Sequence, residues 1–128
     1  MFEEFKIGEK NSVTMTVTEN DTALAMKSGS LKVLATPRLV ALVEEAASTS
    51  AENFLPADYT SVGTSLTVNH VAPTPIGSIV RADVELVEID GRKLIFKVSA
   101  VDNVKEIFNG RHERFIVNRE KFLSKVYN

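Results

Sequence analysis

The sequence predicts an α+β domain in which an antiparallel β-sheet of about five strands wraps around one long central α-helix. One segment, residues 36–55, repeats its apolar residues at helical spacing. The segments before and after it alternate apolar and polar residues with a period of two, as strands do. A single sheet must bury one face, and the only long helix is available to cover it.

The first strand is predicted at residues 12–17, where Val13, Met15 and Val17 point to the same side. Residues 18–32 are rich in Asn, Asp, Ser and Gly. That composition indicates a loop with a short helical piece.

The long helix is predicted to begin at Thr36-Pro37 and to end by Leu55-Pro56. Thr is a favoured N-cap, and Pro is favoured at the first helical position. At about 100° per residue the apolar and polar side chains separate onto two faces. The face predicted to be buried carries Leu39, Val43, Ala46, Ala47, Ser50 and Phe54, and the opposite face carries Arg38, Glu45, Ser48 and Glu52.

Period-two alternation dominates the chain after Pro56. Asp90-Gly91 is a strong hairpin signal between two of the strands. The predicted strands are residues 59–71, 78–88, 92–102 and 106–118, and residues 120–128 are predicted as a short terminal helix.

Length and composition limit what the protein can be. A chain of 128 residues fits one domain, here residues 1–128. The formal net charge is −2 without a dense basic block, so we expect no nucleic-acid or membrane partner. The lack of cysteine excludes thiolate metal sites and disulfides, and no apolar leader or membrane span is present. We therefore expect a cytoplasmic protein with no metal.

His70 lies in an otherwise apolar run, TVNHVAPTPIG. Strict alternation places it on the inward face with Val62 and Leu66, and places Gly63 and Asn69 on the outward face. A core histidine that binds a backbone carbonyl is the simplest interpretation of His70 alone.

Glu44 offers a partner for that histidine. Its neighbour Glu45 falls in the middle of the polar stripe, whereas Glu44 lies at the border of the apolar stripe. A partly desolvated carboxylate there needs a partner on the facing sheet, and His70 faces inward. We expect the two to meet and to serve as a general acid–base or nucleophilic pair, although a structural ion pair is the alternative.

Two further features are candidates for chemistry. Thr36, two turns before Glu44, is most simply a helix cap, but its hydroxyl could also position an anionic or polarised group. In the stretch GRHERFIV, His112 and Arg114 share one strand face. Together they could hold a phosphate or carboxylate, although a cross-strand salt bridge explains them equally well.

Four stretches of the chain resemble a known family: ATPRLVALVEEAA, GTSLTVNHVAPTPIG, GRKLIFKVSAVD and GRHERFIVNREKF. The chain resembles the hotdog-fold acyl-CoA thioesterases, and within them the fluoroacetyl-CoA thioesterase-like family. The resemblance runs nearly end to end. It implies a homodimer, or a higher oligomer, with the sites at the protomer interface.

The resemblance also implies roles for individual residues. Thr36, Glu44 and His70 match the family's catalytic positions. Gly63 matches a glycine whose backbone N–H faces the thioester carbonyl, and Arg114 matches an arginine assigned to substrate binding. Coenzyme A would enter as part of the substrate, with no separate cofactor.

One segment departs from the family pattern. The fluoroacetyl enzyme has an aromatic-bearing lid between the first strand and the helix, whereas residues 23–34 here read ALAMKSGSLKVL and contain no aromatic residue. The resemblance therefore carries thioester hydrolysis to this chain, and not fluoroacetyl selectivity. Two other activities are compatible with the same residues: hydration or dehydration of an acyl-CoA, and acyl-CoA binding without catalysis.

Overall fold

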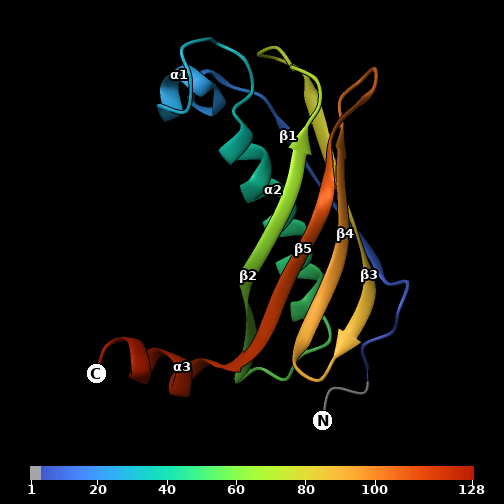
Figure 1. Cartoon of the computed structure of the whole chain (residues 1–128), viewed down its shortest axis with the longest axis vertical. Coiled ribbons are helices and arrows are strands. Elements are labelled where there is room, and N and C mark those ends of the chain that lie inside the picture. The colour runs from blue at the N-terminus through green and yellow to red at the C-terminus, as the bar shows by residue number, and fades with distance from the viewer. Residues whose placement is uncertain (1–3) are drawn as a thin grey trace.

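The computed structural model describes residues 4–128, which form one antiparallel sheet with a long helix along one face (Figure 1). The five strands lie in the order β1-β3-β4-β5-β2. They are β1 (Lys10–Thr16), β2 (Tyr59–His70), β3 (Ile79–Asp90), β4 (Lys93–Val101) and β5 (Glu106–Asn118). The helices are η1 (Glu19–Asp21, 3₁₀), α1 (Ala23–Met26), α2 (Thr36–Glu52) and α3 (Arg119–Val126).

Helix α2 contacts all five strands and forms the centre of the core. Its buried face is the predicted one, extended by Leu42 and Ala51. The helix ends at Glu52, so Phe54 lies beyond it, and its ring packs at a tilt against Phe5, with ring centroids 5.6 Å apart. The predicted α+β fold with the sheet around one helix is confirmed.

The β3–β4 hairpin turns where the sequence predicts. β3 ends at Asp90, and Gly91 adopts a φ of 62°, a left-handed conformation that glycine tolerates without strain. Along β3 the buried side chains are those of the predicted apolar face: Val80, Ala82, Val84 and Leu86.

Strand β2 contains a bulge that strict alternation of its residues does not predict. Gly63 pairs with Arg114 and Ser65 pairs with Glu113, so Thr64 is an extra residue without a partner. An extra residue reverses the alternation on one side of it. Ser61 and Gly63 therefore face the helix, and the predicted outward orientation of Gly63 is wrong. Beyond the bulge, Leu66, Val68 and His70 face the helix as predicted.

β2 is also an edge strand. One of its sides pairs with β5 and, among residues 4–128, no strand pairs with the other. Helix α3 directly follows β5 and projects away from the sheet (Figure 1). Among the described helices, none combines the length and hydropathy that a bilayer-crossing segment requires.

Candidate active site

Thr36 and His70 meet where helix α2 begins and strand β2 ends. The Thr36 hydroxyl oxygen lies 2.7 Å from Nδ1 of His70. Thr36 was expected to cap the helix, but the N-cap is Ala35, and Thr36 is the first helical residue. Because its hydroxyl is not used on the helix amides, it is available to the imidazole. A hydroxyl can donate to or accept from Nδ1, so the pair can form a hydrogen bond in either tautomer of the ring.

The His70 ring is half-buried at the rim of the sheet. Burial lowers the pKa of His70 from its ordinary value of 6.5, and a backbone hydrogen bond with Ala72 partly raises it again. The ring stands edge-on to Phe108, with centroids 6.1 Å apart. Nε2 is buried without a hydrogen bond of normal geometry. The histidine is therefore held neutral, as a general base must be before it acts.

Thr74, a residue that the sequence analysis did not single out, ties the loop after His70 to the start of the helix. Its side chain is fully buried, and its carbonyl oxygen accepts the Leu34 N–H at 2.9 Å. Its hydroxyl donates to the Asp102 carboxylate at 3.3 Å. Thr74 thus links the segments that carry Thr36 and His70.

Glu44 lies two turns after Thr36, in the middle of α2. Its side chain is 42% exposed, whereas Glu45 points to solvent, as the helical spacing predicts. Glu44 faces Gly63 so closely that a β-carbon at residue 63 would lie 2.7 Å from Oε2. Such an approach requires a residue without a side chain, which explains glycine at this position.

Arg114 is the charged partner of Glu44. Its Nη1 lies 3.7 Å from Oε2 of Glu44, and its side chain is only 7% exposed. The guanidinium also donates to Ser61, through Nε to the hydroxyl at 2.8 Å and through Nη2 to the carbonyl at 3.0 Å. Burial lowers the pKa of Arg114, and the nearby carboxylates of Glu44 and Glu52 raise it. Ser61 reaches Arg114 only because the bulge turns it inward.

The described chain does not bring Glu44 to His70. No hydrogen bond or ion pair joins them in residues 4–128, and the expected pairing within one copy is wrong. Thr36 and Glu44 are separated by about 12 Å of helix axis, at 1.5 Å per residue. His70 lies beside Thr36, and Gly63 lies beside Glu44. The candidate site residues therefore form two separate groups, or halves, Thr36–His70 and Glu44–Gly63–Arg114.

Each half borders a shallow open depression. The first depression is lined by Val33, His70, Val71, Ala72 and Pro73. The second is lined by Val40, Glu44, Gly63, Thr64, Ser65, Leu66 and His112. Within the described residues no group of three or more His, Asp or Glu side chains is arranged to hold a metal ion.

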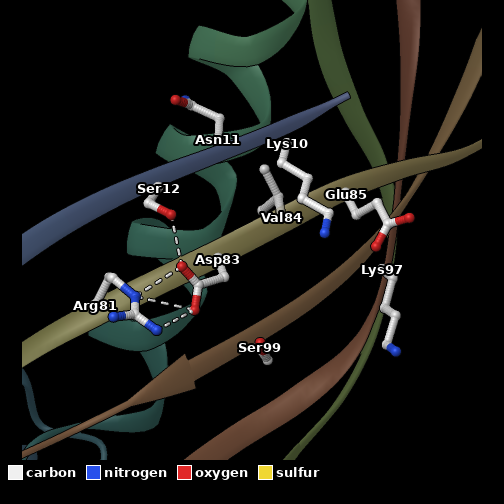
Figure 2. Close-up of a pocket in the computed structure, with 9 residues that line it drawn as sticks. All are labelled: Lys10, Asn11, Ser12, Arg81, Asp83, Val84, Glu85, Lys97 and Ser99. Carbon is white, nitrogen blue, oxygen red and sulfur yellow. Dashed lines mark hydrogen bonds and ion pairs between the residues drawn. The ribbon is translucent and has the colours of Figure 1, made fainter. Parts of the chain in front are cut away.

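A further pocket lies across β1, β3 and β4 and contains none of the predicted site residues (Figure 2). Three of its side chains bind one another. Arg81 and Ser12 both bind the Asp83 carboxylate, at 2.9 Å and 2.6 Å. Asp83 consequently has a lowered pKa, although its burial acts in the opposite direction. We interpret this pocket as a polar network that stabilises the sheet.

The segment between β1 and α2 is compact and lacks aromatic side chains. The Ala23 N–H donates to the Val33 carbonyl at 2.8 Å, and the Leu24 N–H to the Leu31 carbonyl at 3.1 Å. Leu24 and Leu31 expose 46% and 68% of their surface. The segment that would serve as a lid is thus built from small and aliphatic residues.

Comparison with known proteins identifies the family of the chain. Residues 17–120 match the sequence pattern of a family described as fluoroacetyl-CoA-specific thioesterase. A fluoroacetyl-CoA thioesterase of Streptantibioticus cattleyicolor is 41% identical over 95 residues, which are 74% of this chain and 68% of that protein. The chain belongs to this thioesterase family. The family and enzyme class predicted from the sequence are thereby confirmed.

Solved structures agree with this membership. A solved structure of a fluoroacetyl-CoA thioesterase superposes with a TM-score of 0.91 and 33% identity, over 96% of both chains. A hot-dog-like protein from Thermanaerovibrio acidaminovorans has a TM-score of 0.89 at 22% identity, over 98% of this chain and 93% of that one, and supports the fold alone. All five site residues predicted from the sequence fall within the matched residues of the thioesterase family.

Proposed function

We propose that the protein hydrolyses a small acyl-CoA thioester to the free acid and coenzyme A. The observation that carries the proposal is the contact of 2.7 Å between the Thr36 hydroxyl and His70, in a chain of the thioesterase family. Hydrolysis of a thioester needs a group that moves a proton, a carboxylate or water that attacks, and a donor for the developing oxyanion. The two halves of the site provide these groups.

In the proposed reaction the backbone N–H of Gly63 polarises the thioester carbonyl. Neutral His70 takes up the proton that the water molecule releases and passes it to the departing thiolate of coenzyme A, with Thr36 orienting the ring. Glu44, held beside Gly63 and Arg114, acts on the carbonyl carbon. The Arg114 side chain is too deeply buried to reach far into solvent. We therefore propose that it holds the Glu44 carboxylate in place and affects the substrate only through Glu44.

Two routes are compatible with this arrangement. In the covalent route Glu44 attacks the carbonyl carbon, the C–S bond breaks, and water then cleaves the mixed anhydride to the acid and the regenerated carboxylate. In the direct route Glu44 takes a proton from water, the resulting hydroxide attacks the carbonyl carbon, and the C–S bond breaks to release the acid and the thiolate. Single turnover in ¹⁸O-water tests the covalent route. Label in the Glu44 peptide would establish an anhydride, because water that attacks its Glu44 carbonyl leaves an oxygen on Glu44, whereas direct hydrolysis labels only the acid.

We propose a homodimer that joins the two halves of the site. The open edge of β2 can pair with a second copy, and antiparallel pairing would place the Thr36–His70 half of one copy against the Glu44–Gly63 half of the other. Mixing the inactive variants His70→Asn and Glu44→Gln tests this. Random exchange of subunits would restore about a quarter of the wild-type activity if each site uses both copies of a symmetric dimer. No recovery, with exchange shown by mass spectrometry, would contradict the shared site.

The principal test is turnover of an acyl-CoA panel, monitored by release of free thiol. We expect Glu44→Gln to reduce kcat by about 10²- to 10⁴-fold. Glu45→Gln, the same change one residue away on the exposed face, is the control and should match the wild type. Crotonyl-CoA tests the alternative activity, because loss of enoyl absorbance without free thiol would indicate hydration. Absence of turnover on every ester would overturn the proposal.

We do not extend fluoroacetyl selectivity to this protein, because the segment of residues 23–34 carries no aromatic side chain. We propose that small, unfluorinated acyl groups are accepted as well. We also propose that catalysis needs no resident cofactor. The cytoplasmic location stays a prediction from the sequence.

A further inference from the structure

His112 is a buried histidine to which the proposed reaction assigns no role. It lies on β5, exposes 1% of its surface, and faces the cavity beside Glu44 and Gly63. Nδ1 is 2.9 Å from the carbonyl oxygen of Ser65, and Nε2 is 3.0 Å from Nη1 of Arg114. Both ring nitrogens are therefore engaged.

These two partners determine the protonation state of the ring. A carbonyl oxygen can only accept, so Nδ1 must carry the proton that it donates to Ser65. A guanidinium can only donate, so Nε2 must be unprotonated to accept from Arg114. His112 is consequently the neutral tautomer with hydrogen on Nδ1. The two basic residues of this strand face do not hold an anion together, because one is a cation and the other is its acceptor.

We propose that neutral His112 is a positioning residue, which fixes the Arg114 guanidinium beside Glu44 and Gly63. The Arg114 nitrogen that His112 holds, Nη1, is also the one that faces Glu44 at 3.7 Å. Ser61 fixes the other side of the guanidinium through Nε and Nη2. With both sides held, the carboxylate meets a cation of one fixed orientation. The inference rests on the proposed thioesterase function, and it adds a residue to that site.

The surrounding charges keep His112 neutral. Burial lowers its pKa most, and the positive charge of Arg114 lowers it further. The Ser65 hydrogen bond and the carboxylates of Glu44 and Glu113 act in the opposite direction, but the net direction is down. A protonated ring would direct an N–H at the Arg114 guanidinium and break the contact.

Two substitutions of His112 test its hydrogen bonds to Ser65 and to Arg114 one at a time. In His112→Gln the longer amide reaches the place of Nε2, so its oxygen can still accept from Arg114. In His112→Asn the shorter amide reaches only the place of Nδ1 and can serve Ser65 alone. We expect His112→Asn to lower kcat by about 10- to 100-fold with little change in KM, because Glu44 acts in the chemical step. His112→Gln should recover most of the loss.

Equal kcat in His112→Asn and the wild type would overturn the inference, as would equal losses in both variants. The proton position is tested separately, without turnover. In a His70→Gln protein His112 is the only imidazole left, since the sequence has two histidines. Its ¹⁵N shifts should show hydrogen on Nδ1 alone at pH 6, and an imidazolium there would refute the proposal even if His112→Asn fails to fold. No turnover by the wild type would instead overturn the proposed function.

Discussion

The Glu44 carboxylate occupies the space that a side chain at residue 63 would need. A β-carbon on Gly63 would lie 2.7 Å from Oε2 of Glu44, 3.2 Å from Cε1 of His112 and 3.4 Å from Nη1 of Arg114. The backbone of an edge strand thereby approaches a carboxylate, a cation and an imidazole at one point. A thioester carbonyl that binds to this backbone would lie within reach of Glu44.

Gly63→Ala should therefore reduce catalysis more than stability. The closest atom is the end of a flexible side chain, so Glu44 can move aside at small cost to folding. That movement displaces the carboxylate from the carbonyl, and displacements of about 1 Å can reduce rates by about 100-fold. The measurement is kcat together with the urea midpoint of unfolding. A large fall in the midpoint with unchanged kcat would contradict this account of the glycine.

Thr36→Val should lower kcat, and Thr36→Ser should largely preserve it. Valine keeps the shape of threonine but cannot bind Nδ1 of His70, whereas serine keeps the hydroxyl. We expect a loss of about 10-fold or more for valine, which is part of the roughly 10²- to 10⁴-fold contribution of a well-placed acid–base group. Helix stability should change little, because the Thr36 side chain does not cap α2. Steady-state kinetics on the best substrate gives the comparison, and equal rates for valine and serine would exclude a role for the hydroxyl.

Stability should fall as the pH drops through the range in which histidines titrate. The folded-state pKa values of both His70 and His112 are lowered, so the unfolded chain binds protons that the folded chain does not. The contribution of the two histidines to the free energy of unfolding is fully present above about pH 6.5, the ordinary pKa of histidine. It declines as the pH falls below that value. Urea unfolding between pH 8 and pH 5 measures this slope.

His112→Gln provides the control for that slope. His112 is the more deeply buried of the two rings, so its removal should flatten most of the decline. The lowered pKa values of Asp21, Asp83 and Asp102 affect stability only at lower pH, where carboxylates titrate. A decline that remains unchanged in His112→Gln would show that the histidine is not its source.

Gly110→Ala should destabilise the fold severely. A β-carbon there would collide with the Thr67 carbonyl oxygen and would lie 2.7 Å from Cα of Val68, both part of the β2 backbone. Backbone atoms of a paired strand cannot move aside as a side chain can, so we expect a loss of about 2 kcal/mol or more. Thermal unfolding measures it. Gly77→Ser is a useful contrast, because open space surrounds Gly77 and only its φ of 95° resists substitution.

The sequence predicts most of the fold because its periods are clear. β5 begins and ends at the predicted residues, and the β3–β4 hairpin turns at the Asp90-Gly91 pair. The border position of Glu44 and the inward position of His70 also follow from helical and strand spacing. These are the features that local periodicity and turn chemistry determine.

Other features depend on contacts that no local pattern reveals. The bulge at Thr64 leaves the residue types unchanged but turns Ser61 and Gly63 toward the helix. Thr74 and Ser61 are small polar residues whose roles come from burial and from distant partners. The N-cap prediction for Thr36 failed because Ala35 adopts the capping conformation without offering a side chain. A signal for the bulge existed in the glycine beside Thr64, since isolated glycines within strands mark such irregularities.

Because of the bulge, the number of residues between Gly63 and His70 is fixed. This spacing matters for engineering the protein and for finding relatives in genomes. Gly63 and His70 are seven positions apart, and in a regular strand an odd separation would place them on opposite faces. Because of the bulge at Thr64, both lie on the face that is turned to α2. An insertion or deletion of one residue between them would turn one half of the site to solvent while leaving every motif letter in place. Candidate relatives are therefore better screened by the number of residues between this glycine and this histidine than by their identities alone.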